Sequence, residues 1–252
     1  MKTCLYFTYD GLLDPLGQSQ ILPYILNLNN NGYKFIIISY EKYSKNEKKF
    51  KALSKKLSKN GIQWNPLRFR KWKLHFFVRI ISGIVFTKLI IFRNKINLVH
   101  LRGGFSGLIY FFSFSKINYL YDLRAFWGQW ADGGRTKYGS LIYKLLIKLE
   151  KNLIKKASGI IVLDKSGEIY IRKNFELKVP LTIIPTSTNI KKYKIKDRFS
   201  RAKLKFVYLG GGKHPPYRIK DAVLFIKDLL EKNIDCEIDF INKNDRDIIK
   251  KI

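Results

Sequence analysis

The stretch FIIIS at residues 35–39 is one of several short, continuous apolar runs that alternate with helical patterns along the chain. A strand that is apolar on both faces is typical of a parallel sheet covered by helices on each side. Similar runs occur in TCLYF at 3–7, LVHL at 98–101 and GIIVL at 159–163. The alternation predicts an α/β fold built on a Rossmann-like, doubly wound parallel sheet.

The elements between these runs follow from the same patterns. Further strands are expected at 61–64, 118–123 and 181–184, and helices at 19–29, 45–59, 74–93, from 106, 141–156 and 166–174. In such a sheet, ligands bind at the carboxyl ends of the strands.

A polar, basic stretch at 191–203 interrupts the alternation. We expect an N-terminal Rossmann-like domain over 1–190, a linker over 191–203 and a second, Rossmann-like domain over 204–252. The second domain shows one strand–helix–strand unit, followed by a helix starting at Asp245. Because a lone unit of this kind cannot bury both faces of its sheet, we expect this domain to be incomplete.

The composition is strongly basic, with 49 Lys and Arg against 19 Asp and Glu and a formal net charge of +30. This excess favours polyanionic partners, or it reflects an A+T-rich coding sequence whose lysines are simply solvated. No helix-turn-helix, zinc-finger or RNP-like pattern is present, so nucleic acid is not expected as a partner. Cys4 and Cys236 have no CxxC partner, which is typical of small core residues in a reducing cytoplasm.

The most apolar segment, 74–92, is interrupted by Arg79 and Lys88. A spanning helix has about 20 apolar residues with few charges, so a transmembrane span is not expected, and a surface-lying helix is left open. The N-terminus is too short in apolar length for a signal peptide. A cytoplasmic location is therefore predicted.

Five segments carry candidate chemistry. The glycine-containing loop at 10–20 follows the first strand, where backbone amides and a helix N-terminus favour an anion; the alternative is an ordinary turn capped by Ser19. Gly210-Gly211-Gly212-Lys213, with Arg218 and Lys220, forms a basic, Gly-rich loop suited to a diphosphate, although it lacks the P-loop pattern. A DxD match at 245–247 stands at an expected helix start, where chance explains it best.

The other two segments end predicted strands. Asp122 and Arg124 would orient a hydroxyl or contact phosphate, or they form a structural ion pair. His100 would transfer a proton, or it is a satisfied core histidine. Arg102 ends the same strand. Aromatic residues Phe126, Trp127 and Trp130 would stack on a sugar, or pack in the core.

The order and spacing of several motifs resemble family-4-type GT-B glycosyltransferases, which build bacterial surface polysaccharides. The resemblance covers nearly the whole chain. Its motifs are DPLGQSQ at 14–20, VHLRGG at 99–104, YDLRAFW at 121–127, ASGIIVLD at 157–164, IIPTSTN at 183–189 and VYLG at 207–210.

The resemblance implies a retaining enzyme that transfers a hexose from a nucleotide sugar to a saccharide or lipid-linked acceptor, without a cofactor or metal. It implies catalytic roles for Asp122, Arg124 and His100. It assigns the donor phosphates to Gly17, Gln18, Gly210, Gly211, Lys213, Arg218 and Lys220, and the acceptor to Arg102, Phe126 and Trp127. Related enzymes carry a histidine where this chain has Asp122, which leaves the identity of any base open.

Related enzymes also carry donor-binding acidic residues, spaced E-x7-E, beyond the position of Ile252. We therefore expect this chain to be truncated and to transfer sugar poorly. The alternative is a non-catalytic, basic module that binds a membrane or an acceptor.

In the resembled enzymes the N-terminal domain often meets the membrane. Residues 71–81 mix cations with aromatic residues at the start of a helix, which favours an anionic surface. We expect peripheral binding at the inner face of the plasma membrane. The alternative is a core helix with Lys71, Lys73 and Arg79 solvated.

Overall fold

The computed structural model describes residues 2–42, 47–69, 74–132, 136–187, 204–210 and 219–241. The chain divides into two compact units. Residues 1–128 and 141–188 make up the first unit, and residues 129–140 and 189–252 make up the second. The predicted linker at 191–203 lies outside the described residues, and the predicted domain boundaries stay a prediction.

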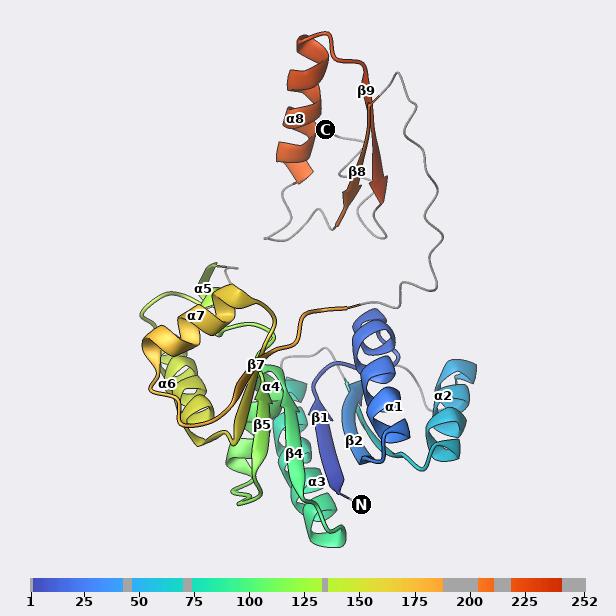
Figure 1. Ribbon diagram of the computed structural model, residues 1–252, viewed down its shortest axis with the longest axis vertical. Helices are drawn as coiled ribbons and strands as arrows, with labels where there is room; N and C mark the ends of the chain where they lie inside the picture. The colour runs from blue at the N-terminus through green and yellow to red at the C-terminus, as the bar shows by residue number, and fades with distance from the viewer. Residues whose placement is uncertain are drawn as a thin grey trace. The chain divides into compact units, whose positions relative to one another are not determined.

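The first unit contains a seven-stranded sheet in the order β3-β2-β1-β4-β5-β6-β7 (Figure 1). Every neighbouring pair is parallel, which confirms the predicted Rossmann-like α/β fold. Its strands are β1 Thr3–Thr8, β2 Lys34–Glu41, β3 Gln63–Arg68, β4 Leu98–Arg102, β5 Tyr119–Asp122, β6 Gly159–Val162 and β7 Leu181–Ile183.

Helices connect these strands. They are the π-helical turn η1 Gly17–Ile21, α1 Leu22–Asn30, α2 Lys48–Lys59, α3 Leu74–Arg93, α4 Gly103–Phe112, α6 Leu141–Lys156 and α7 Lys165–Asn174. Helix α4 begins three residues earlier than expected. Ser19 lies inside η1, and its hydroxyl donates to the carbonyl of Pro15, so it is not the helix N-cap.

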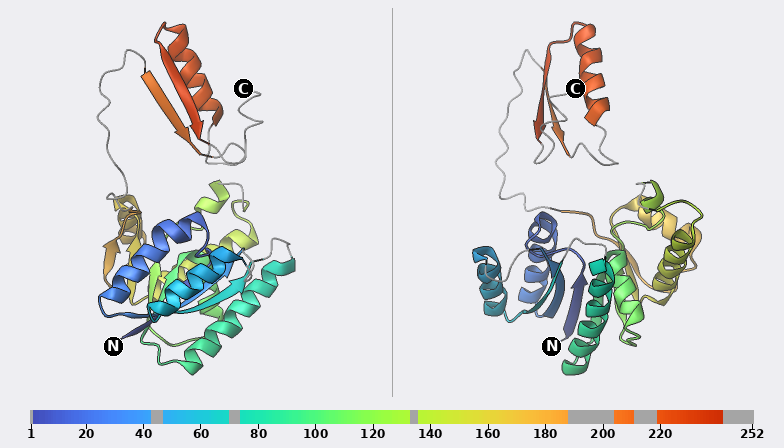
Figure 2. Two further views of the ribbon diagram at one scale, coloured as in Figure 1. Left: turned by 90° about the vertical axis from the view of Figure 1, so that its right-hand side faces the viewer. Right: turned by 180° about the vertical axis from the view of Figure 1, so that it is seen from behind.

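The sheet is buried on both faces, as its continuous apolar strands require. One core cluster joins Tyr6 and Ile37 of the sheet to Ile25 of α1. The opposite cluster joins Phe7 of the sheet to Leu153 of α6. Figure 2 shows the helices on both sides of the strands.

The chain changes direction across the sheet between β1 and β4. It runs outward from β1 through β2 to β3, then returns through α3 to β4 on the other side of β1. The carboxyl ends of two strands at such a switch point face a crevice that binds ligands in open α/β sheets. The fold therefore singles out the carboxyl ends of β1 and β4.

Helix α3 has one charged side chain on its inner face. Arg79 is buried; its Nε donates to the Tyr9 hydroxyl at 2.7 Å and its guanidinium lies 4.5 Å from the centre of the Phe69 ring. The expectation that Arg79 is solvated is therefore wrong, because aromatic residues after β1 and β3 enclose it. The outer face exposes large apolar side chains, among them Phe77, Val78, Ile81, Val85 and Phe92. Over the described ranges, no helix has the length and apolar character needed to cross a membrane.

The second unit contains a parallel pair of strands, β8 Leu204–Leu209 and β9 Cys236–Ile241, with helix α8 Ile219–Glu231 between them in sequence. A short helix, α5 Gln129–Asp132, also belongs to it. The strand–helix–strand unit predicted here is confirmed, whereas the helix predicted from Asp245 lies outside the described residues. Both cysteines are free and buried.

Candidate functional site

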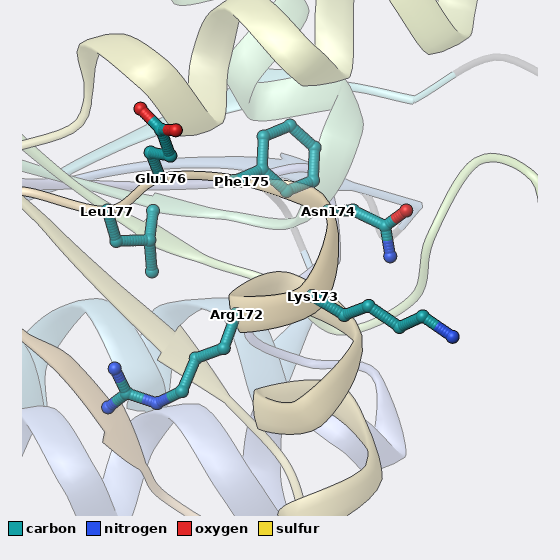
Figure 3. Close-up of a pocket in the computed structure, with 6 residues that line it drawn as sticks. All are labelled: Arg172, Lys173, Asn174, Phe175, Glu176 and Leu177. Carbon is teal, nitrogen blue, oxygen red and sulfur yellow. The ribbon is translucent and has the colours of Figure 1, made fainter.

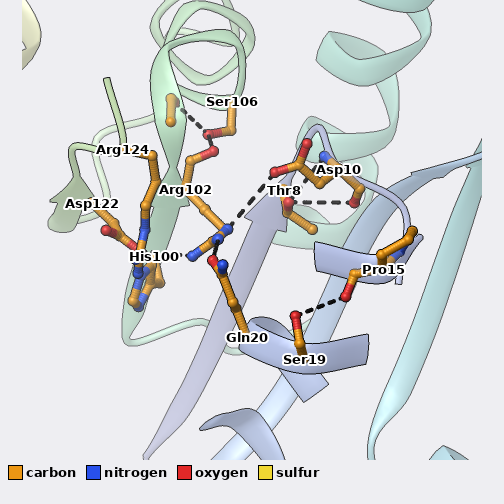
Figure 4. A network of polar contacts seen from close by, with 11 residues as sticks. Thr8, Asp10, Pro15, Ser19, Gln20, His100, Arg102, Ser106, Asp122 and Arg124 are labelled. Carbon is orange, nitrogen blue, oxygen red and sulfur yellow. Dashed lines mark hydrogen bonds and ion pairs between the residues drawn. The ribbon is translucent and has the colours of Figure 1, made fainter. Parts of the chain in front are cut away.

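Charged side chains gather where β1, β4 and β5 end (Figure 4). The strand register sets Thr8 opposite Arg102, and Arg102 opposite Asp122. His100 lies two residues before Arg102, so its side chain points to the same face of the sheet. Polar side chains on such a buried face need partners close by, and these residues supply them to one another.

Asp122 is the centre of this cluster. Its Oδ2 lies 2.8 Å from Arg124 Nη2, 3.2 Å from His100 Nε2 and 3.7 Å from Arg102 Nη1. The ring of His100 packs against the ring of Tyr6, with centroids 4.5 Å apart. One carboxylate oxygen thus holds three nitrogen-bearing side chains, two from β4 and one from the loop after β5.

The electrostatics of the cluster keep this carboxylate ionised. Burial alone would raise the pKa of Asp122, but its hydrogen bond and electrostatic interaction with His100, together with the charge of Arg124, outweigh it, so its pKa lies below the usual value. An ionised Asp122 compensates the buried guanidinium of Arg102, which stays protonated in proteins.

Arg102 links this centre to the loop after β1. Its Nη2 donates to Gln20 Oε1 at 2.7 Å, and its Nε lies 3.8 Å from Asp10 Oδ2. Asp10 is half-exposed, and burial raises its pKa, although the charge of Arg102 opposes this shift. The Ser106 hydroxyl donates to the Arg102 carbonyl at 2.7 Å and ties the start of α4 to the same point.

Three buried polar atoms of the cluster have no hydrogen-bond partner within the part of the chain that the structure describes. They are Asp122 Oδ1, Arg102 Nε and Arg124 Nε. Native proteins leave few such atoms, and each calls for an explanation. At the ligand-binding edge of a sheet, a hydroxyl group of a ligand would supply the missing partner.

The loop between β1 and η1 is held by Glu41, at the end of β2. The main-chain N–H groups of Leu12 and Leu13 donate to its carboxylate at 2.6 and 3.3 Å. Gln18 Nε2 donates to the Leu12 carbonyl, and a Cβ on Gly17 would lie 2.1 Å from the Gly11 carbonyl oxygen. Gly17 and Gln18 therefore shape this loop, and their predicted contact with the donor phosphates stays a prediction.

The aromatic residues after β5 pack inward. Trp127 is only 2% exposed, and a Cβ on Gly104 would overlap its indole ring. Its main-chain N–H donates to Glu150 Oε1 at 3.0 Å. Phe126 is half-buried against Tyr170, with ring centroids 4.5 Å apart. In this arrangement Trp127 offers no open ring face to an acceptor, whereas Phe126 is partly accessible.

Apart from Gly17 and Gln18, the predicted donor residues belong to the second unit. Lys220 is exposed in the first turn of α8, and Gly210 directly follows β8. The remaining donor residues Gly211, Lys213 and Arg218 lie outside the described residues, as does the DxD match at 245–247. Among the residues that the structure describes, no group of three or more His, Cys, Asp or Glu side chains is placed to hold a metal ion.

A separate hollow lies at the end of α7 (Figure 3). Residues 172–177 line this open hollow of about 480 Å³. Because α7 starts where β6 ends and leads back to the start of β7, the hollow lies at the amino edge of the sheet. It is therefore remote from the charged cluster and does not belong to that site.

Sequence reasoning singled out His100, Arg102, Asp122 and Arg124, and the structure brings these four together. It missed the parts played by Asp10, Gln20, Glu41 and Glu150. Asp10 and Glu41 carried a usable signal, because each is an acidic residue at the end of a buried strand. Gln20 and Glu150 carried none, since each lies on a helix among other polar residues.

Neither protein-family models nor the sequences of curated proteins match the chain. Its structure is similar to that of sucrose-phosphate synthase from Thermosynechococcus elongatus, with a TM-score of 0.60 and 12% identity over 99% of this chain and 72% of that one. It is also similar to the lipopolysaccharide outer core galactosyltransferase WaaB, with a TM-score of 0.58 and 11% identity over 100% and 64% of the two chains.

A third similar structure is the UDP-GlcNAc 2-epimerase from Neisseria meningitidis bound to UDP-GlcNAc, with a TM-score of 0.54 and 12% identity over 100% and 68% of the two chains. This chain has the fold of GT-B enzymes. The GT-B resemblance predicted from the motifs is thus confirmed at the level of fold. A structural similarity at 11–12% sequence identity shows the fold. The reaction depends on the residues of the site.

Proposed function

We propose that this GT-B chain belongs to a glycosyltransferase that uses a nucleotide sugar, with the acceptor bound at the first unit and the donor at the second. The observation that carries the proposal is the charged cluster around Asp122, at the switch point of the sheet. Two of the similar structures are a galactosyltransferase and a sucrose-phosphate synthase. The motif resemblance adds the finer assignment of a retaining enzyme of surface polysaccharide synthesis that transfers a hexose to a saccharide or lipid-linked acceptor.

The proposed chemistry relies on positioning and charge. The acceptor oxygen bonds to the anomeric carbon of the donor sugar, and the bond from that carbon to the nucleotide diphosphate breaks, with the electron pair leaving on the phosphate. The departing phosphate oxygen takes up the proton that the acceptor hydroxyl loses. Ionised Asp122 fixes Arg124 and Arg102 at the acceptor edge, and such fixed groups lower the barrier by orientation. Cations and helix amides of the Gly-rich segment around Lys220 stabilise the departing diphosphate.

The second candidate function is epimerisation of a nucleotide sugar, because an epimerase solved with UDP-GlcNAc shares the fold. This reaction needs no acceptor. The two candidates therefore agree on a nucleotide-sugar ligand and differ in whether a second saccharide takes part.

A nucleoside diphosphate is the first ligand to test. We expect UDP to bind the purified chain in isothermal titration calorimetry, and an excess of single-stranded DNA not to displace it. Lys220→Ala should weaken UDP binding by roughly three- to ten-fold, because a cation in the first turn of α8 supplements the helix N-terminus in holding phosphate.

Lys227→Ala is the matched control, since Lys227 is equally exposed on α8 but lies two turns further along. Its UDP affinity should equal that of the native chain. Displacement of UDP by an excess of single-stranded DNA, or equal losses of UDP affinity in both variants, would contradict a dedicated nucleotide site.

Membrane binding is proposed for the segment around the start of α3. Phe77, Val78 and Ile81 are exposed and follow shortly after the basic residues Arg70, Lys71 and Lys73 in the sequence. These three basic residues lie outside the described part of the chain. Vesicle co-sedimentation should show binding that rises with the anionic lipid fraction and falls with salt. Changing all three basic residues to Glu should reduce binding strongly, because each cation near an anionic surface contributes about 1 kcal/mol.

A control variant changes Lys51, Lys55 and Lys59 of α2, which are exposed, to Glu. If this control loses as much binding as the first triple variant, the net charge of the chain drives the association. Equal binding by the first triple variant and the native chain would remove this segment as the anchor.

A further inference from the structure

The members of the charged cluster differ in what a ligand can reach. The side chains of Asp122, His100 and Arg102 are 1%, 4% and 4% exposed. Arg124 is 23% exposed and Asp10 is 47% exposed. A molecule arriving at this edge of the sheet thus meets Asp10 and Arg124 first, while the other three form the layer beneath them.

Asp10 is held in place but keeps its carboxylate open. Its main-chain N–H donates to Thr8 Oγ1 at 3.1 Å, and the Thr8 hydroxyl donates back to the Asp10 carbonyl at 3.3 Å. Arg102 Nε approaches Asp10 Oδ2 to 3.8 Å, which is too long for a hydrogen bond. Within the described residues, the carboxylate accepts no hydrogen bond from a protein group, so its oxygens are available to a ligand.

The charges of the cluster indicate what kind of ligand fits. Two carboxylates, of Asp10 and Asp122, face two guanidinium groups, of Arg102 and Arg124. A further ionic group would disturb this balance at a partly buried site, where uncompensated charge is costly. Neighbouring hydroxyls suit it well, because one donates to a carboxylate while the next accepts from a guanidinium.

We infer that Asp10 binds a hydroxyl of a neutral saccharide acceptor, with Arg124 contacting a neighbouring hydroxyl and Asp122, His100 and Arg102 positioning both residues from below. This inference rests on the proposed function and names the residue and the acceptor chemistry of the same site. The motif resemblance implied catalytic roles for Asp122, Arg124 and His100. In this proposal Arg124 contacts the substrate, whereas Asp122 and His100 act as positioning residues, because a substrate reaches neither before Asp10 and Arg124.

The test uses the full chain and defined saccharides. Methyl glycosides of glucose, galactose and N-acetylglucosamine are titrated in saturation-transfer NMR, with glucuronate and glucose 6-phosphate as anionic comparators. We expect at least one neutral glycoside to bind the native chain more tightly than either anion. Asp10→Asn should weaken that binding by about ten-fold, because it replaces one hydrogen bond to a charged acceptor with a neutral one.

Asp14→Asn is the matched control, since Asp14 lies in the same loop but pairs with Lys42 at 2.6 Å. Its saccharide affinity should stay at the native value. Unchanged binding in Asp10→Asn overturns the role of Asp10, tighter binding of an anion overturns the ligand class, and no binding of any saccharide overturns the acceptor site. UDP binding is measured separately and tests the proposed function. Failure of the saccharide experiment can therefore be distinguished from failure of the proposed function.

Discussion

Asp122→Ala is expected to lower the free energy of unfolding by about 3–5 kcal/mol, the usual cost of removing one partner from a buried ion pair. The carboxylate is 1% exposed and contacts His100, Arg102 and Arg124. Without it, the guanidinium of Arg102 stays charged and buried, while the carboxylate of Asp10, 3.8 Å from its Nε, is half-exposed to water. Urea denaturation at pH 7, followed by circular dichroism, measures the loss.

The pH dependence of this loss has a defined sign. The folded-state pKa of Asp122 lies below its usual value, so its contribution is present above the ordinary carboxyl pKa of about 4 and is lost as pH falls through the lowered value. The gap between native chain and variant should therefore narrow in acid. A gap that widens in acid would contradict an ionised Asp122.

Asp14→Ala serves as the control, because it removes a carboxylate whose partner, Lys42, is half-exposed. Such pairs contribute only about 0–1 kcal/mol. Asp122→Asn keeps the shape of the side chain and one acceptor oxygen. Its loss in the free energy of unfolding should therefore fall between the losses of Asp122→Ala and Asp14→Ala. Equal, small losses in Asp122→Ala and Asp14→Ala would mean that the cluster does not stabilise the fold.

The regular elements followed from local pattern wherever one face was consistently apolar. Helices α3 and α6 have the bounds expected from their patterns. Helix α4 was placed too late, because Gly103 and Gly104 resemble a loop in the sequence. Gly103 adopts a positive φ of 78°, and Gly104 lacks a side chain where the indole of Trp127 packs. The partner that makes glycine necessary lies 23 residues away in the sequence, beyond the reach of local pattern.

The site was predictable to the extent that strand alternation governs it. His100 and Arg102 are two residues apart on one strand, so the sequence alone places them on one face. Their contact with Asp122 depends on the register between β4 and β5, which no local pattern specifies. Arg79 shows the same limit, since its burial comes from Tyr9 and Phe69 on other segments.

Glu150→Gln is expected to stabilise the protein at pH 8 and to change little at pH 5. Glu150 is 4% exposed, and burial raises its pKa to about 7, although the hydrogen bond from the Trp127 N–H opposes the rise. A carboxyl whose folded pKa exceeds its unfolded pKa binds more protons in the folded state. Its presence therefore costs stability as pH rises from about 4.5 through about 7.

The shift corresponds to about 3 kcal/mol at pH 8, at 1.36 kcal/mol per pKa unit. Glutamine removes this penalty while its amide oxygen still accepts from the Trp127 N–H, so the loop after β5 keeps its anchor. Glu168→Gln is the control. Glu168 pairs with Lys165 and Arg172 on the surface of α7, so removing its charge should not increase the stability of the protein at pH 8. Thermal unfolding of the three proteins between pH 5 and pH 8 decides the matter, because an equally steep decline in Glu150→Gln would assign the pH dependence to another buried group.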